Sequence, residues 1–144
     1  MSAAQNKATI RRLFDEGMAG NLDIFDEVIA PDYIGHNPPS YPGGQEMHGP
    51  QSQKGSFADV LASFPDITAS LEHLVAEDDY AALRVQYEGT FQNAYAGIPP
   101  NGKRFTLTYN IVYRFDSSGK ITEEWLEWDT LSVAQILGIL PVSG

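Results

Sequence analysis

The sequence predicts an α+β fold in which N-terminal helices pack on the concave face of a curved, mostly antiparallel sheet. Two observations support this prediction. Up to residue 64, apolar residues recur with the helical period of 3.6, and from residue 67 they alternate with the period of two that is typical of strands. Helices followed by a meander of strands indicate that the helices cover one face of a sheet. Such a curved sheet leaves a cavity between itself and the helices.

The composition limits the class of protein. The 144 residues suffice for a single domain, 1–144, and an apolar fraction of 42% is ordinary for a globular chain. Because cysteine is absent, disulfides and thiolate chemistry are excluded. The net charge of −10 disfavours nucleic acid or a membrane surface as a partner. No apolar run reaches the ~20 residues of a membrane span, and the first residues lack a secretory apolar stretch, so we expect a cytoplasmic protein.

The N-terminal part is predicted to be helical. A first helix is expected from about residue 4 to residue 18, where apolar side chains form one stripe. These side chains are Ile10, Leu13, Phe14 and Met18. A short helix that is capped by Asn21 and closed by Pro31 follows it. The Pro- and Gly-rich stretch 35–50 is expected to be an ordered loop near a pocket mouth.

A third helix and a set of strands complete the predicted elements. The helix is expected between Pro50, which suits a first helical turn, and Pro65, which ends it. Four strands are then expected at residues 67–76, 80–91, 105–115 and 121–130. The acidic segment 77–79 and the segment 116–119 read as turns between neighbouring strands.

The register of the last hairpin decides which residues share a face. A two-residue turn places Asp129 opposite Thr108. It also places Glu127 opposite Asn110, whereas a four-residue loop shifts both partners two residues toward the N-terminus. Either register puts Asp129 on the polar face of the hairpin. The opposite face of the longer strand is apolar and consists of Phe105, Leu107, Tyr109, Ile111, Tyr113 and Phe115.

Three stretches resemble the SnoaL-like branch of the nuclear-transport-factor-two-like superfamily. They read APDYIGHNP at residues 30–38, GT and then GIPPNGK between residues 89 and 103, and GKITEEWLEWD at residues 119–129. The resemblance implies a cone-shaped, cystatin-like α+β barrel, an oligomer and a deep apolar pocket. In the characterised cyclases, the Asp that closes the motif Trp-x-x-x-Asp is the general acid/base, and this role maps onto Asp129. Many members have His immediately before the motif's Trp, whereas this chain has Glu124.

Asp129 and His36 are the predicted catalytic residues. If Asp129 faces a dry pocket beside Glu127, desolvation and like charge raise its pKa. It could then take a proton from carbon and return one to a forming alkoxide. Asp129 could instead cap the strand end or pair with an arginine. His36 could hydrogen-bond a substrate carbonyl or orient Asp129, or it could be satisfied by loop backbone.

Seven further residues are predicted to bind substrate. They are Tyr33, Phe57, Arg84, Thr108, Asn110, Trp125 and Glu127. The three aromatic residues could form walls for a flat substrate, although such residues also serve as plain core. Arg84 could enter the pocket or lie on the outer face of the sheet. Thr108 and Asn110 share the predicted face of Asp129, where they would stabilise an enolate oxygen.

The predicted function is a cofactor-free polyketide (ester) cyclase that closes a ring by aldol chemistry on an apolar small molecule. The alternatives are an epoxide hydrolase-like or ketosteroid isomerase-like enzyme on the same fold, or a non-catalytic binding module. No metal is expected, because the three histidines lack helical ligand spacing. We expect a homodimer or homotetramer if aromatic side chains of the last two strands form an outer apolar patch. The candidates are Tyr109, Tyr113, Phe115 and Trp128.

Overall fold

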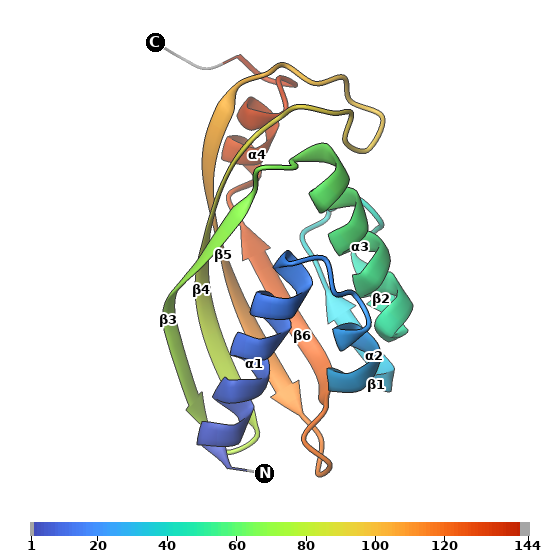
Figure 1. Ribbon diagram of the computed structural model, residues 1–144, viewed down its shortest axis with the longest axis vertical. Helices are drawn as coiled ribbons and strands as arrows, with labels where there is room; N and C mark the ends of the chain where they lie inside the picture. The colour runs from blue at the N-terminus through green and yellow to red at the C-terminus, as the bar shows by residue number, and fades with distance from the viewer. Residues whose placement is uncertain (1, 142–144) are drawn as a thin grey trace.

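The computed structural model describes residues 2–141 and has the α+β architecture that the sequence predicts, with helices on one side of a six-stranded sheet (Figure 1). The predicted domain, 1–144, includes residues 1 and 142–144, which lie outside the described residues. The helices are α1 (Ala3–Met18), α2 (Ile24–Val28), α3 (Gly49–Ser63) and α4 (Thr130–Ile136). The strands are β1 (Ile29–His36), β2 (Glu46–His48), β3 (Thr68–Glu77), β4 (Tyr80–Thr90), β5 (Arg104–Phe115) and β6 (Ile121–Trp128).

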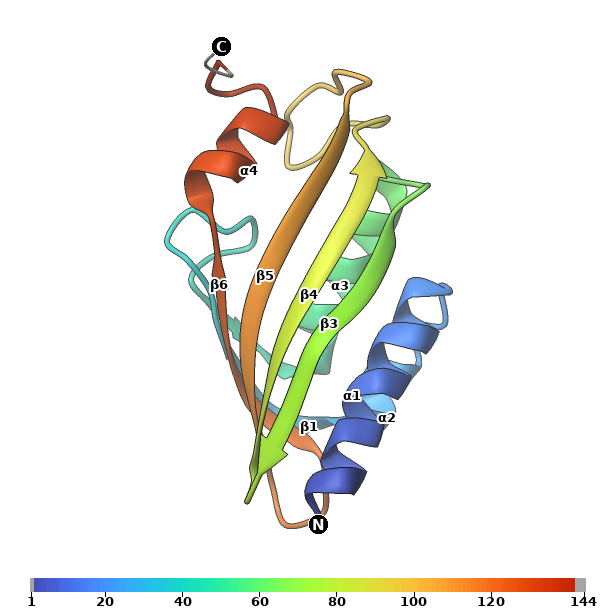
Figure 2. The same ribbon diagram turned by 90° about the vertical axis from the view of Figure 1, so that its left-hand side faces the viewer.

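The sheet has the strand order β2-β1-β6-β5-β4-β3 and is mostly antiparallel. Four of the five neighbouring pairs are antiparallel, and β1 runs parallel to β6. The sheet is curved but open, because β2 and β3 form its two edges. Figure 2 shows the outer face of the long strands β3, β4 and β5, with α3 behind them. None of the described helices is long and apolar enough to span a membrane.

The helix α1 forms as its sequence pattern predicts. It begins with a capping box, in which the Ser2 side chain accepts a hydrogen bond from the Gln5 backbone and the Gln5 side chain accepts one from the Ser2 backbone. Its buried apolar side chains belong to the main core between helices and sheet, and they are Ile10, Leu13 and Phe14. Burial of this stripe positions α1 against the inner face of β3 and β4.

The sequence pattern did not reveal β1 and β2. The predicted short helix ends at Val28, and Ile29 already begins β1, which runs through Pro31 to His36. The parallel register with β6 shifts between Ile29 and Ile34, and Pro31 lies within this irregularity. Proline is tolerated there because its missing N–H costs no regular ladder bond. The predicted loop 35–50 was therefore wrong at both ends, because β1 extends to His36 and β2 begins at Glu46.

The last strand is shorter than predicted. It ends at Trp128, and Asp129 becomes the N-cap of α4, where its side chain accepts hydrogen bonds from the Ser132 backbone at 3.2 Å and the Ser132 hydroxyl at 2.7 Å. The sequence Asp-Thr-Leu-Ser is a helix start of this kind, because a capping Asp satisfies an N–H that the first helical turn leaves free. The strand prediction had extended to residue 130.

The β5–β6 pairing confirms the register of a two-residue turn over most of the hairpin, with Asn110 opposite Glu127. The polar face points away from the helices. Tyr113 and Phe115 are only 3% and 2% exposed and lie in the main core, so the expectation that they form an outer apolar patch was wrong. The same correction applies to Tyr109 and Trp128, which pack against this core. The homodimer or homotetramer stays a prediction.

Candidate functional site

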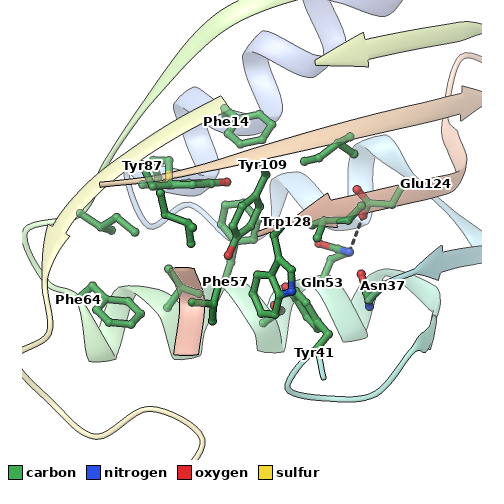
Figure 3. Close-up of a pocket in the computed structure, with 18 of the residues that line it drawn as sticks. Phe14, Asn37, Tyr41, Gln53, Phe57, Phe64, Tyr87, Tyr109, Glu124 and Trp128 are labelled. Atoms are coloured by element: carbon green, nitrogen blue, oxygen red, sulfur yellow. Dashed lines mark hydrogen bonds between the residues drawn. The ribbon is translucent and has the colours of Figure 1, made fainter. Parts of the chain in front are cut away.

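A cavity lies between the inner face of the sheet and the helices α1 and α3, with α4 at one end. The loop between β1 and β2 contributes Tyr41 to its wall. Most of its lining is apolar or aromatic, as Figure 3 shows for Phe14, Phe57, Phe64, Tyr87, Tyr109 and Trp128. Aromatic and aliphatic walls with few polar groups are typical of sites for small organic molecules.

Glu124 is the only charged residue among the described residues that line this cavity. It lies on β6 and alternates with Leu126 and Trp128, so its side chain points to the inner face of the sheet. It is 6% exposed. In Figure 3, Glu124 and Gln53 lie at one end of the cavity and Phe64 lies at the other. The cavity is therefore an apolar chamber with one carboxyl group near one end.

Two side chains hold one oxygen of this carboxyl group. The Tyr33 hydroxyl, on β1, donates a hydrogen bond to Glu124 Oε1. Gln53 Nε2, on α3, lies 2.6 Å from the same oxygen and 2.6 Å from Tyr33 Oη, and it donates to both. Glu124 Oε2 accepts no hydrogen bond from the described residues. The carboxyl group is thus held through Oε1 alone by the described residues.

Burial controls the protonation of Glu124. Desolvation raises its pKa from the usual 4.5 to about 7, because the charged form loses the water that would solvate it. The hydrogen bond from Tyr33 favours the charged form and lowers the pKa, but it does not offset the desolvation. A carboxyl group with a pKa near neutrality is present in both forms, so it can accept a proton and give one back.

Gly35 makes the contact between Tyr33 and Glu124 possible. In the parallel pair of β1 and β6, Gly35 lies directly opposite Glu124. Tyr33 lies two residues earlier on the same face of the strand, and its side chain crosses over Gly35. A Cβ atom at position 35 would lie 2.5 Å from Tyr33 Oη, which is closer than real Cβ contacts allow. A glycine is therefore needed where the tyrosine reaches the carboxyl group.

The predicted placement of Asp129 in a dry pocket is wrong. Asp129 is exposed, it does not line the cavity, and hydrogen bonds from Ser132 lower its pKa rather than raising it. The error has a physical cause. Trp128 is the last residue of β6, and the chain then turns into α4, so strand alternation does not extend to position 129. Asp129 acts in the structure as a helix cap, and a catalytic role for it stays a prediction.

The predicted residues His36 and Trp125 meet on the outer face of the sheet. Their rings stack with centroids 5.4 Å apart and an interplanar angle of 14°. His36 Nε2 lies 2.6 Å from Glu123 Oε2, and Arg114 Nη2 lies 2.8 Å from Glu123 Oε1. Hydrogen bonds from Arg114 and His36 lower the pKa of the Glu123 carboxyl. Neither His36 nor Trp125 lines the cavity, and a role for them in catalysis or substrate binding stays a prediction.

The remaining predicted residues divide between the two faces. Arg84, paired in register with Asn110, lies on the outer face, and its Nε is 3.8 Å from Glu72. Thr108 lies two residues from Asn110 on β5, and Glu127 pairs with Asn110 from β6, so both share this outer face and are absent from the cavity lining. The other two residues lie on the cavity side of the sheet. Phe57, on α3, lines the cavity, and the Tyr33 hydroxyl, on β1, donates a hydrogen bond to Glu124.

Sequence reasoning missed Glu124 and Gln53 as members of the site. Glu124 had a signal, because it interrupts the alternation of large apolar residues on β6 and shares the parity of Leu126 and Trp128. Choosing the polar face of the hairpin as the pocket face hid that signal. Gln53 lies in a polar run of α3 and had no comparable signal. Within residues 2–141, no group of three His, Asp or Glu residues could hold a metal ion.

Comparison with known proteins places this geometry in a family context. Residues 8–137 match the sequence model of the SnoaL-like polyketide cyclases. No curated protein matches the chain. IdmH from Streptomyces antibioticus, provisionally assigned as a polyketide cyclase, is 30% identical, with 93% of this chain and 99% of IdmH covered and a TM-score of 0.78.

Two further solved structures share the fold. A provisionally assigned SnoaL-like polyketide cyclase from Jannaschia sp. CCS1 is 22% identical over 96% of this chain and 95% of that chain, with a TM-score of 0.82. AclR from Streptomyces galilaeus, provisionally assigned as a hydroxylase, is 24% identical over 99% of this chain and 87% of AclR, with a TM-score of 0.84.

The variant Gly35→Ala tests the assembly of the site. The added methyl group must displace Tyr33, so we expect the free energy of unfolding to fall by about 1–3 kcal/mol in urea titrations. Gly55→Ala is the matched control, because Gly55 lies within α3 with open space around its Cβ position. That variant should gain about 0.5–1 kcal/mol from helix propensity. Equal effects of the two substitutions would contradict the packing described for Gly35.

The raised pKa of Glu124 predicts a pH dependence of stability. The folded state binds this proton more tightly than the unfolded state, so the stabilisation is fully present below pH 4.5 and is lost as the pH rises through about 7. As the pH rises from 4.5 to about 7, the unfolding free energy of the wild type should fall by about 3 kcal/mol relative to that of Glu124→Gln. Urea titrations across this range measure the difference. Glu127→Gln, on the outer face, should keep the wild-type trend, and a parallel trend in Glu124→Gln would exclude the raised pKa.

Proposed function

This chain belongs to the SnoaL-like polyketide cyclase family, and we propose that it closes a ring in an apolar polyketide-type substrate by intramolecular aldol chemistry. Glu124 is the general acid/base of this proposal. One observation carries it: among residues 2–141, a single buried carboxyl group faces the apolar cavity, with one oxygen held by Tyr33 and Gln53 and the other without a donor. The family match supports the reaction class, and the geometry supports the choice of residue.

The proposed reaction needs one group that moves one proton twice. Glu124 Oε2 removes a proton from a carbon that lies between two carbonyl groups, which leaves an enolate. The enolate carbon attacks a carbonyl carbon of the same molecule, a C–C bond forms, and the carbonyl oxygen becomes an alkoxide. The proton on Glu124 then passes to the alkoxide, which restores the carboxylate. A pKa of about 7 suits both steps, because neither proton transfer is strongly uphill.

Tyrosine hydroxyls of the cavity could stabilise the enolate oxygen. Tyr87 and Tyr109 line the cavity, and burial raises the pKa of each phenol above its usual range. Their hydroxyl groups therefore keep their protons at neutral pH and remain donors. Hydrogen-bond donors fixed in a water-poor site stabilise developing negative charge more strongly than water does. These residues replace Thr108 and Asn110 in the proposed mechanism.

The described residues of the cavity distinguish the alternative functions. A hydrolase of the epoxide-opening kind would hold a water between a carboxyl group and a second charged group, and Glu124 is alone among the described lining residues. An isomerase would use the same removal and return of a proton on carbon. Product analysis separates isomerase from cyclase, since only ring closure forms a new C–C bond.

Proton exchange at carbon tests the role of Glu124 directly. A naphthyl β-ketoester in deuterated buffer should lose its central C–H signal faster with the wild-type chain than without it, as followed by NMR. Glu124→Gln keeps the hydrogen-bonding shape but cannot take a proton, so the accelerated exchange should fall by about 10²–10⁴-fold. Because the base form is required, the wild-type rate should rise with pH and level off above about 7.

The variant Asp129→Asn provides the competing outcome. Asparagine is also a good N-cap, so α4 should stay intact, and exchange should remain at the wild-type level. Loss of exchange in Asp129→Asn with retention in Glu124→Gln would return the acid/base role to Asp129 and overturn the proposal.

A further inference from the structure

One polar group of a cavity-lining residue takes no part in the proposed proton transfer. Trp128 Nε1 is buried and has no hydrogen-bond partner among residues 2–141. The indole belongs to a residue that lines the cavity, on the same face of β6 as Glu124 and four residues further along the strand. In an extended strand, four residues separate the Cα atoms by about 13 Å. Trp128 and Glu124 therefore line the same cavity at separate positions.

The indole ring is held in place by aromatic neighbours. Tyr41 packs against it with centroids 4.9 Å apart, and Tyr109 meets it edge-on at 5.6 Å with an interplanar angle of 71°. Tyr41 is itself fixed, because its hydroxyl lies 3.1 Å from Ser56 Oγ on α3. Figure 3 shows Tyr41 and Tyr109 close to the Trp128 ring. Packed in this way, the ring cannot turn freely to find another acceptor.

We infer that the Trp128 indole N–H donates a hydrogen bond to an oxygen of the bound ligand and selects aromatic ketones over hydrocarbons of the same shape. A buried donor without a partner costs more free energy than one that is paired, so a ligand without an oxygen at this point leaves the cost in place. A ligand carbonyl supplies an acceptor with two lone pairs. The surrounding rings suit a flat aromatic body.

This inference rests on the proposed function only in taking the cavity as the substrate site, because it concerns binding and not proton transfer. It names the ligand class as flat aromatic molecules that carry a carbonyl oxygen away from the carbon that Glu124 deprotonates. Trp128 then determines specificity in the binding of the substrate, before any proton is transferred.

A pair of probe ligands tests the inference. Acetylnaphthalene carries a carbonyl group, and isopropylnaphthalene, substituted at the same ring position, has nearly the same shape without it. Calorimetric titration gives the ratio of their affinities for each variant. In Trp128→Phe, which keeps an aromatic ring but removes the N–H, we expect this ratio to fall about three- to tenfold against the ketone. Trp125→Phe is the matched control, since the structure places Trp125 on the outer face of the same strand, and its ratio should equal that of the wild type.

A second measurement uses the wild-type chain and does not depend on the folding of a variant. The chain has two tryptophans, so its nitrogen–proton spectrum contains two indole signals, which Trp125→Phe assigns. Acetylnaphthalene should move the Trp128 signal downfield, as a new hydrogen bond does, and isopropylnaphthalene should not.

Several outcomes would overturn the inference. These are an unchanged affinity ratio in Trp128→Phe, an equal response of the Trp128 signal to both probes, and the absence of saturable binding of both probes to the wild type. A changed ratio together with full proton exchange in Glu124→Gln would leave the ketone contact standing and refute the proposed function instead. The two proposals can therefore fail separately.

Discussion

The structure depends at its centre on the burial of one carboxyl group in an apolar chamber. Removing Glu124 from water is costly, and the fold compensates with two donors on one oxygen, from Tyr33 and Gln53. This compensation is incomplete, which is why the pKa of Glu124 stays near 7. The glycine at position 35, the parallel pairing of β1 with β6 and the polar face of α3 all serve the same contact. The chemistry proposed for the cavity follows from this incomplete compensation.

Patterns within one element predicted much of the fold. The stripe of α1, the strand alternation after residue 67 and the register of the β5–β6 hairpin follow from local spacing, and the structure has them. β1 was missed because a proline lies in it and its pairing partner lies far away in the sequence. The start of α4 was missed because the capping role of Asp129 was read as a strand end.

The candidate site was harder to predict than the fold, for one physical reason. Sequence alternation separates the two faces of a strand, but it does not say which face lines a cavity. The polar face of the hairpin carries groups suited to catalysis, but it points outward, where Asn110 and Glu127 are exposed and Trp125 stacks on His36. The apolar face forms the chamber, and its single charged residue is the informative one. In such folds, the exception within an apolar face is a better guide to the site than a polar cluster.

The parallel pairing of β1 with β6 also bears on how the chain acquires its site. Tyr33 and Glu124 are 91 residues apart in sequence, so their contact closes a loop of most of the chain. Long-range pairings of this kind form slowly and late, because the entropy of closure is lost before the contacts are gained. During synthesis, β6 is the last strand to be made, so the chamber lacks its carboxyl group until β6 has paired with β1. The proposed chemistry would become possible only after this pairing.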